Sequence, residues 1–216
     1  MSTQANKLRK KIKSPALAGF FVFKTVPSHG DNTYLRSKDI SMAIAKPFNL
    51  HQWIEENREL LKPPVGNKNL YPAGEDYIVM IVGGPNARKD YHYNETEELF
   101  YQLEGNITVR IQEEGKPVDI NLGPGDMFLL PPKVPHSPMR SEGSVGLVVE
   151  RVRQSDHQDG LMWFCDNCNH KLHETYFPLT NIEKDFLPRF KEFYASEDLR
   201  TCKKCNHQME TDPRFV

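Results

Sequence analysis

Residues 84–105 read GPNARKDYHYNETEELFYQLEG and place a histidine, His92, six residues before a carboxylate, Glu98. Farther along, residues 125–136 read GDMFLLPPKVPH and end in a second histidine, His136. Two histidines and one carboxylate are the protein ligands of non-haem Fe(II) sites that keep positions open for substrate and oxygen. The pattern therefore predicts one metal centre held by His92, Glu98 and His136, with the rest of the chain as its scaffold.

Short strands are expected on both sides of this stretch. Apolar and polar residues alternate over 107–111 and 118–122, which is typical of half-buried strands. Apolar runs predict further strands at 77–82, 99–103, 127–130, 145–149 and 170–177. Glycine-containing turns at 113–116 and 123–126 separate some of them. Short strands at near-even spacing with no helix between them predict an all-β barrel or sandwich.

Two helices are expected to flank these strands. Asn49 can cap a helix over residues 50–61, which has an apolar side and ends before a pair of prolines. Thr180 and Glu183 have the spacing of a capping box, and the residues that follow place their apolar side chains on one face. Both helices are therefore predicted to pack against the strands.

Length and charge narrow the class of protein. The 216 residues suffice for one large domain or one domain with a small appendage, and 38% hydrophobic residues can build a core. A net charge of −1 disfavours nucleic acid as a partner, since phosphate binding needs a basic excess. No apolar run reaches the roughly 18 residues that a membrane span needs, so no membrane association is expected.

The first segment of the chain is basic. No acidic residue precedes Asp31, whereas lysines and one arginine recur before it. We expect residues 1–46 to be an N-terminal extension and the protein to be cytoplasmic. Mitochondrial targeting by this basic segment is the alternative.

The four cysteines form two C-x-x-C pairs, Cys165 with Cys168 and Cys202 with Cys205. Without a secretory signal, this pattern predicts a metal site rather than disulfides. Four thiolates suit zinc or iron equally, and such a closed shell predicts a structural role, with electron transfer as the alternative. The composition changes after Arg153, where residues 154–160 are predicted to form a polar linker. Three parts follow: the extension 1–46, a catalytic barrel over 47–153 and a metal-binding tail over 154–216.

The two histidine stretches resemble the two motifs of the cupin family. In its first motif a glycine and five residues precede His-x-His, and a glutamate, six residues and a glycine follow. Here Gly84 and five residues precede Asp90-Tyr91-His92, and six residues separate Glu98 from Gly105. The first histidine of that motif is therefore Asp90. The resemblance implies a jelly-roll barrel with a few flanking helices and the small four-cysteine knuckle.

The second cupin motif is matched by Gly125, Pro131 and His136, with Arg140 at the position of the usual asparagine. Because Asp90 replaces the first histidine of the first motif, three protein ligands remain instead of four. Three ligands on one face of an octahedron leave three positions free, enough for a bidentate substrate and O2.

Two arginines and one acid indicate the charge of the substrate. Arg88 lies four residues before His92 and Arg140 four residues after His136, so both are expected near the metal as a clamp for a carboxylate. Glu150 ends the apolar run 145–149, where an inward carboxylate is costly unless it is paired or functional. The alternative for each of the three is an ordinary surface ion pair.

From about Pro47 to the C-terminus the chain closely resembles the 3-hydroxyanthranilate 3,4-dioxygenase family, in its microbial form with a rubredoxin-like tail. The resemblance rests on FN (48–49), KPPVGN (62–67), VGGPN (82–86), DYH (90–92), EELFYQ (97–102), FLLPP (128–132), HSP (136–138) and FYASED (193–198). It implies Fe(2+) at His92, Glu98 and His136, and a second iron, with zinc as the alternative, at the cysteines.

The resemblance also implies roles in substrate binding and turnover. The catalytic residues would be Arg88, Arg140 and Glu150, the last pairing with the substrate amine and taking its proton. The substrate-binding residues would be Arg88, Glu98, Arg140, Glu150 and Asn67. The implied reaction joins 3-hydroxyanthranilate with O2 to give 2-amino-3-carboxymuconate semialdehyde, the precursor of quinolinate in kynurenine degradation and NAD biosynthesis.

The resemblance further implies a homodimer. Three other functions stay open at this point: another cupin dioxygenase or isomerase acting on a carboxylated compound, a non-catalytic cupin that binds a small acid, and a zinc-ribbon nucleic-acid binder. The net charge disfavours the last of these.

Overall fold

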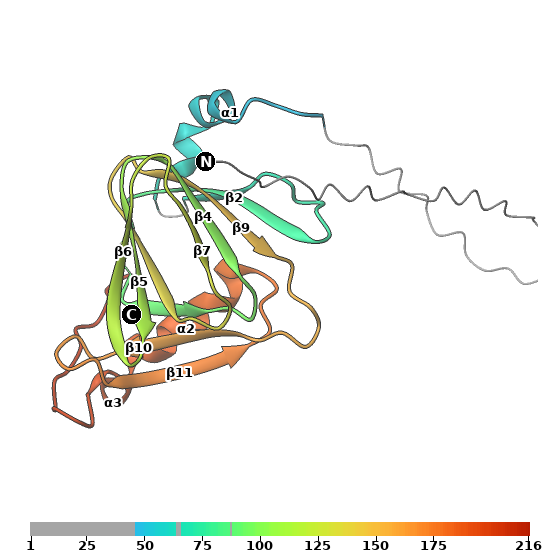
Figure 1. Ribbon diagram of the computed structural model, residues 1–216. Helices are drawn as coiled ribbons and strands as arrows, with labels where there is room; N and C mark the ends of the chain where they lie inside the picture. Colours follow the sequence, from blue (N-terminus) through green and yellow to red (C-terminus); the bar gives the residue numbers. More distant parts are fainter. Residues whose placement is uncertain (1–45, 64–65, 87) are drawn as a thin grey trace, which may run out of the picture. The chain divides into compact units, whose positions relative to one another are not determined.

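The computed structural model describes residues 46–63, 66–86 and 88–216. The predicted N-terminal extension, except for Lys46, lies outside the described residues. From Pro47 onwards the chain forms one unit of two antiparallel β-sheets with a few flanking helices (Figure 1). Within this described part, no helix combines the length and apolar character needed to cross a bilayer.

Both sheets join strands that are distant in sequence. The first sheet has the order β1 (Asn67–Asn69), β2 (Tyr77–Gly83), β9 (Val145–Arg151), β4 (Glu98–Glu104) and β7 (Met127–Leu130). The second has the order β11 (Lys171–Phe177), β10 (Asp159–Phe164), β3 (Asp90–Tyr93), β8 (His136–Arg140), β5 (Ile107–Glu113) and β6 (Lys116–Leu122). Two facing sheets linked in this way form a cupin jelly roll that is not fully closed, which confirms the predicted fold class.

Four strands were not anticipated from the hydrophobic pattern. β1, β3 and β8 are three to five residues long and rich in polar residues, so they lack the apolar run that marks a longer strand. β10 begins at Asp159, and the predicted polar linker over 154–160 is therefore wrong at its last two residues. The reason is that Asp159 is buried at the start of this strand and is not exposed to solvent.

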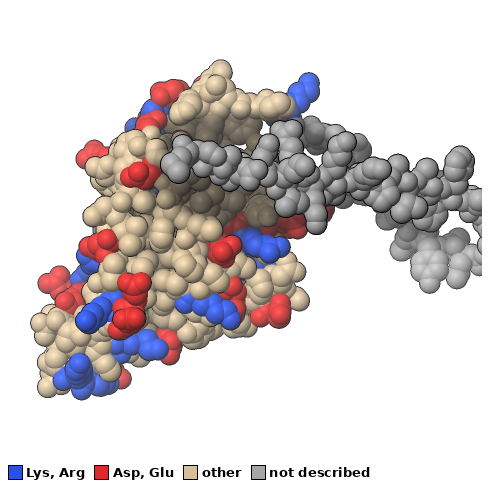
Figure 2. Space-filling model, viewed as in Figure 1, with Lys and Arg blue, Asp and Glu red and all other residues tan. Residues whose placement is uncertain are grey.

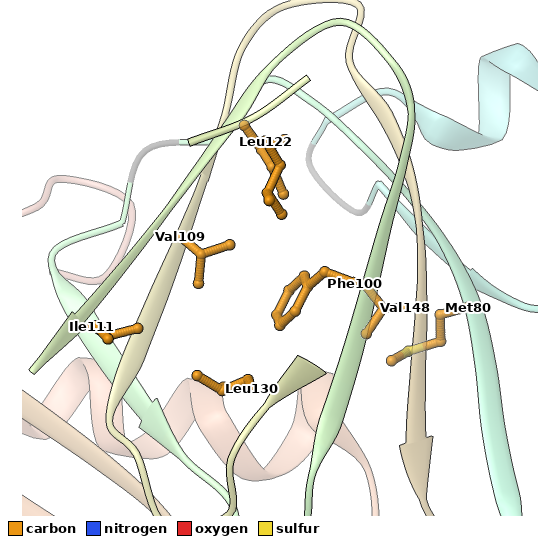
Figure 3. Packing of buried hydrophobic residues seen from close by; sticks show 8 residues of the cluster. Met80, Phe100, Val109, Ile111, Leu122, Leu130 and Val148 are labelled. Atoms are coloured by element: carbon orange, nitrogen blue, oxygen red, sulfur yellow. The ribbon is translucent and has the colours of Figure 1, made fainter. Parts of the chain in front are cut away.

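The main core fills the space between the two sheets (Figure 3). Met80, Phe100 and Val148 project from the first sheet toward Val109 and Ile111 of the second. Alternate residues of β4 and β5 are buried, as the period of a strand requires. Burial of each large apolar side chain contributes about 1.5–3 kcal/mol, so this layer holds the sheets in fixed relation.

The first helix, α1 (Leu50–Glu56), is capped as predicted, because the Asn49 side chain accepts a hydrogen bond from the backbone of Gln52. It is shorter than the predicted range 50–61. The Asn57 side chain donates to the Trp53 carbonyl and ends the helix, and a 3-10 turn, η1 (Arg58–Leu61), follows. Ile54 of α1 and Leu61 of η1 are buried in a small cluster with residues of the first sheet.

The second helix, α2 (Ile182–Ala195), packs on the sheet that carries the histidines. Trp163 of β10 stacks on Phe193 with ring centroids 4.3 Å apart. The helix cap is Asn181, whose side chain accepts from the backbone of Lys184. The predicted cap at Thr180 is wrong, because the Thr180 hydroxyl donates to the Asp185 carboxylate instead. A short helix, α3 (Glu197–Arg200), leads into the last cysteine pair.

The surface mixes both signs of charge. Figure 2 shows lysine and arginine side chains interspersed with aspartate and glutamate over the visible face, with apolar and neutral residues between them. This distribution agrees with the net charge of −1.

Candidate metal centre and active site

Three strands bring the predicted ligands together. His92 on β3 and His136 on β8 are direct partners across their strands, and Glu98 opens β4 of the facing sheet. One ligand atom of each side chain lies within 4.8 Å of the other two, and all three side chains are buried. The fold therefore places the three residues where one ion can reach them all.

Two ligand atoms are left without hydrogen-bond partners. Glu98 Oε2 and His136 Nε2 are buried, lie 3.1 Å apart, and have no hydrogen-bond partner in the described part of the chain. His136 Nδ1 faces the carbonyl of Val134 at 3.0 Å, which leaves the Nε2 lone pair free. Atoms bonded to one ion at about 2.1 Å and at right angles stand about 3.0 Å apart. The donor set and its spacing thus fit a divalent metal.

The protonation of Glu98 and His92 suits metal binding, whereas that of His136 depends on the ion. Burial opposes the charge of Glu98, but the neighbouring rings of His136 and His92 outweigh it, so the pKa of this carboxyl is lowered. Burial lowers the pKa of His92 as well, although its hydrogen bond to Asp159 opposes the shift. Burial opposes charge on the His136 ring, but the Glu98 carboxylate outweighs it, so the pKa of His136 is raised, and a bound cation would displace this proton. A carboxylate and a neutral imidazole are the forms that a metal ion needs.

A cavity of about 110 Å³ lies at these ligands. Its lining includes every residue that the sequence singled out for the catalytic metal and the substrate: Asn67, Arg88, His92, Glu98, His136, Arg140 and Glu150. Asn67 begins β1 at the edge of the first sheet, and the others come from both sheets or the loop before β3. Their roles remain predictions, but their shared location matches the clamp that the sequence suggested.

Arg140 is the clearest candidate for binding an anion. The residue is 5% exposed, and its Nη1 is buried without a hydrogen-bond partner among the described residues. Burial lowers the pKa of Arg140 to about 10, so the guanidinium is still charged at neutral pH. A buried cation with a free donor offers a strong site for a carboxylate or a reduced oxygen species.

Arg88 already has an acidic partner. Its Nε donates to Asp90 at 3.2 Å, and its Nη2 forms a second contact with the same carboxylate. Asp90, which stands where cupins carry a histidine, is buried but lies outside the ligand cluster. The replacement thus removes a metal ligand and orients the arginine beside the cavity.

Glu150 faces Glu98 across the pairing of β9 with β4. Burial, aided by the negative charge of Glu98, raises the pKa of Glu150 to about 7, against the opposing effect of Arg153. A carboxyl that titrates near neutral pH can accept a proton from a bound substrate and release it again.

Two buried charged residues at this site were not found from the sequence. His92 Nε2 lies 2.7 Å from Asp159, and Arg153 binds both Asp159 and Glu150. In the sequence Arg153 marked only a change in composition, and Asp159 belonged to the predicted linker. The one available signal was an acid directly before the apolar run 160–164, a position where burial is expected.

Helix α2 supplies an apolar wall that the sequence also did not reveal. Ile182 and Phe186 line the same cavity, and the Phe186 ring lies 5.3 Å from that of His92. The pattern of α2 predicted a buried face but not what it covers. The segment after Arg153 therefore contributes two strands to the second sheet and part of the active-site wall, while the predicted domain boundaries remain predictions.

The four cysteines form a second cluster. None of the four is in a disulfide, and their sulfur atoms all lie within 4.8 Å of one another. Two of the sulfur pairs, Cys165 with Cys205 and Cys168 with Cys202, are 3.6 Å apart. Four sulfurs bonded at about 2.3 Å in a tetrahedron stand about 3.8 Å apart, whereas a disulfide is about 2.05 Å long. The spacing fits a closed tetrathiolate metal site.

Replacing Cys202 with serine is expected to lower the melting temperature by about 10 °C, because Cys202 is fully buried and a metal held by the four thiolates would contribute folding energy. The catalytic metal content should not change. Calorimetry and metal analysis measure the two effects. Loss of activity in folded variant that still carries the catalytic metal would contradict a purely structural role.

The chain is similar to known proteins in both sequence and structure. A profile of the 3-hydroxyanthranilic acid dioxygenase family matches residues 42–194. A relative from Xanthomonas euvesicatoria pv. vesicatoria, named 3-hydroxyanthranilate 3,4-dioxygenase, is 57% identical over 173 residues, which are 80% of this chain and 97% of the relative. A relative of the same name from Paraburkholderia phytofirmans is 47% identical over 167 residues, 77% of this chain and 95% of the relative.

Among solved structures, a cupin-2 domain protein from Shewanella frigidimarina is similar with a TM-score of 0.39 and 20% identity, over 46% of this chain and 92% of that one. The family profile covers more than half of the chain, and the sequence relatives are matched over nearly their whole length. The chain therefore belongs to the 3-hydroxyanthranilic acid dioxygenase family.

Proposed function

We propose that this chain is an Fe(II)-dependent 3-hydroxyanthranilate 3,4-dioxygenase. It would open the ring of 3-hydroxyanthranilate with both atoms of O2 to give 2-amino-3-carboxymuconate semialdehyde, the precursor of quinolinate in kynurenine degradation and NAD biosynthesis. The observation that carries the proposal is one cavity lined by His92, Glu98, His136, Arg88, Arg140 and Glu150. The names of the relatives support the choice of substrate.

Each residue of the cavity has a distinct task in this proposal. His92, Glu98 and His136 would hold Fe(II), which when bound supplies the redox chemistry with O2. Arg140 and Arg88 bind the ring carboxylate and stabilise negative charge on the oxygen side. Glu150 accepts a proton from the amino group of the substrate. The apolar side chains of α2 keep water away from the ring.

The proposal also covers the second metal and the assembly. The cysteine cluster would hold iron, with zinc as the alternative, and metal analysis decides between them. We expect a cytoplasmic location, where reducing conditions keep the thiols available. We also expect a homodimer, as the resemblance to the family implies. Sedimentation equilibrium of the purified chain measures its mass directly.

The direct test loads the purified chain with Fe(II) under anaerobic conditions and then adds 3-hydroxyanthranilate and air. The expected result is a product that absorbs in the near ultraviolet and converts to quinolinate, with O2 consumed in a one-to-one ratio. Protein without added metal serves as the control. If the loaded protein binds 3-hydroxyanthranilate but makes no such product, the chain is a binding protein and the proposed function is wrong.

The pH dependence of kcat/KM is expected to follow Glu150. Its pKa is raised from 4.5 to about 7, so the side chain is protonated below that pH and cannot accept a proton. Activity should therefore rise with pH up to about 7 and fall roughly tenfold for each unit below it. A cation bound by Glu98 would weaken the repulsion and move this limb to somewhat lower pH.

Glu150→Gln is expected to lower kcat about 10²- to 10⁴-fold and to remove the acidic limb of the profile. Glu142 is an exposed acid in the loop before β9 and provides the matched control Glu142→Gln. This variant should keep the wild-type kcat and the acidic limb of the pH profile. An unchanged limb in Glu150→Gln would show that another group titrates there.

A further inference from the structure

A continuous row of buried charged and polar side chains runs from a predicted metal ligand to the predicted base. His92 Nε2 lies 2.7 Å from Asp159 Oδ2. Arg153 donates to both oxygens of Asp159, from Nε at 3.0 Å and from Nη2 at 2.7 Å. The remaining Nη1 of Arg153 donates to Glu150. One guanidinium therefore joins the partner of His92 to Glu150, an acid that lines the cavity.

These groups are removed from water. The side chains of His92 and Arg153 are each 8% exposed, that of Glu150 5% and that of Asp159 1%. Two buried carboxylates require a cation with several donors, and the planar fork of arginine supplies them in fixed directions. A lysine would keep the charge but could not hold both carboxylates in the same geometry.

The row also spans the two sheets. Glu150 belongs to β9 of the first sheet, and Asp159 begins β10 of the second, next to β3, which carries His92. Arg153 lies in the connection between β9 and β10. His92, the predicted ligand, and Glu150, the predicted base, thus lie on different sheets. The contacts of Arg153 link the two residues by way of Asp159.

We propose that Arg153 and Asp159 are positioning residues of the active site, an inference that rests on the proposed function. Asp159 accepts the Nε2 proton of His92 and so sets the ring orientation and leaves Nδ1 to the metal. Arg153 holds Asp159 in that place and at the same time holds Glu150 toward the cavity. Carboxylates behind ligand histidines tune metal sites in this way. The competing view is that the row only ties the sheets together.

The first test measures Fe(II) affinity of the metal-free catalytic site by chelator competition, a readout independent of turnover. Asp159→Asn and Arg153→Lys are each expected to weaken Fe(II) binding about 10- to 100-fold. Arg110→Lys is the matched control, because Arg110 binds Asp119 with the same two-pronged geometry on the exposed face of β5 and β6. Affinity of Arg153→Lys equal to that of Arg110→Lys would overturn the proposal.

The second test is a double-mutant cycle on kcat/KM between Asp159→Asn and Glu150→Gln, two residues that share Arg153 as donor. With Arg153 present, the combined loss is expected to differ from the product of the single losses by about tenfold. In an Arg153→Met background the losses should multiply. If that background does not fold, as judged by circular dichroism, Arg153→Lys takes its place. If the losses caused by Asp159→Asn and Glu150→Gln simply multiply with Arg153 present, the row of charged residues only holds the two sheets together and the positioning role is wrong.

The two proposals can fail separately. If wild type and Arg110→Lys both fail to oxidise 3-hydroxyanthranilate, the proposed function is wrong, and the Fe(II) affinities still decide the role of Asp159 and Arg153. If both turn over the substrate and the Arg153 variants match them in affinity and in the cycle, only the positioning role is wrong.

Discussion

His92→Ala is expected to abolish turnover, with a drop in kcat of at least about 10⁴-fold, and to remove one of two metal ions from each chain. His92 is one of only three ligands that the fold brings within reach of a single ion among the described residues. Two remaining side chains, Glu98 and His136, leave too few bonds to hold Fe(II) against solvent. Metal analysis and an oxygen-uptake assay measure both losses.

The matched control is His51→Ala. His51 is exposed on α1 and is not among the residues that line the cavity, so His51→Ala should keep both metals and the full rate. The metal that remains in His92→Ala should have the spectrum of a tetrathiolate, because the cysteine cluster does not depend on His92. A His92→Ala protein with two metals and wild-type turnover would show that the ligand set is wrong.

Arg88→Ala is expected to keep the catalytic iron and to lower kcat/KM for 3-hydroxyanthranilate about 10²- to 10³-fold. Two physical effects contribute. The substrate carboxylate loses one cation, and the buried Asp90 loses the partner that neutralises it. Steady-state kinetics of the purified variant measure kcat/KM, and metal analysis measures its iron content.

Two further measurements separate these effects. With 2-aminophenol, which lacks the carboxylate, the part of the loss due to substrate binding should disappear. In the double variant Arg88→Ala with Asp90→Asn, the unpaired acid is removed, so thermal stability should recover while the rate does not. Wild-type kinetics in Arg88→Ala would mean that Arg88 pairs with Asp90 for structure alone and does not touch the substrate.

The clustering of the three candidate metal ligands was predictable because their spacing is set by local chain geometry. His92, Glu98 and His136 occupy fixed places relative to glycines and prolines that end the neighbouring strands. The motif can therefore be recognised from the spacing of these residues along the chain. The strands that hold the two histidines were less visible. β3 reads DYHY and β8 reads HSPMR, and such short polar runs give no hydrophobic period to detect.

The apolar wall of the site shows a second feature that the sequence alone could not predict, namely which surfaces pack together. The periodic pattern of α2 showed that Phe186 would be buried, but not against which surface. The structure places it beside His92, because β10 and β11 extend the second sheet and give the helix a surface to pack on. Packing partners far apart in sequence are set by the whole fold and leave no local mark.

By itself the sequence determined the all-β fold and pointed to two candidate metal clusters and the residues that line the cavity at one of them, since strand periodicity and ligand spacing are local properties of the chain. Only the tertiary structure decided how these groups are held. It paired Arg88 with Asp90 and joined Asp159, Arg153 and Glu150 behind His92. The physical reason is that a buried charge must find a partner wherever the fold offers one, and that partner depends on which strands the two sheets bring together.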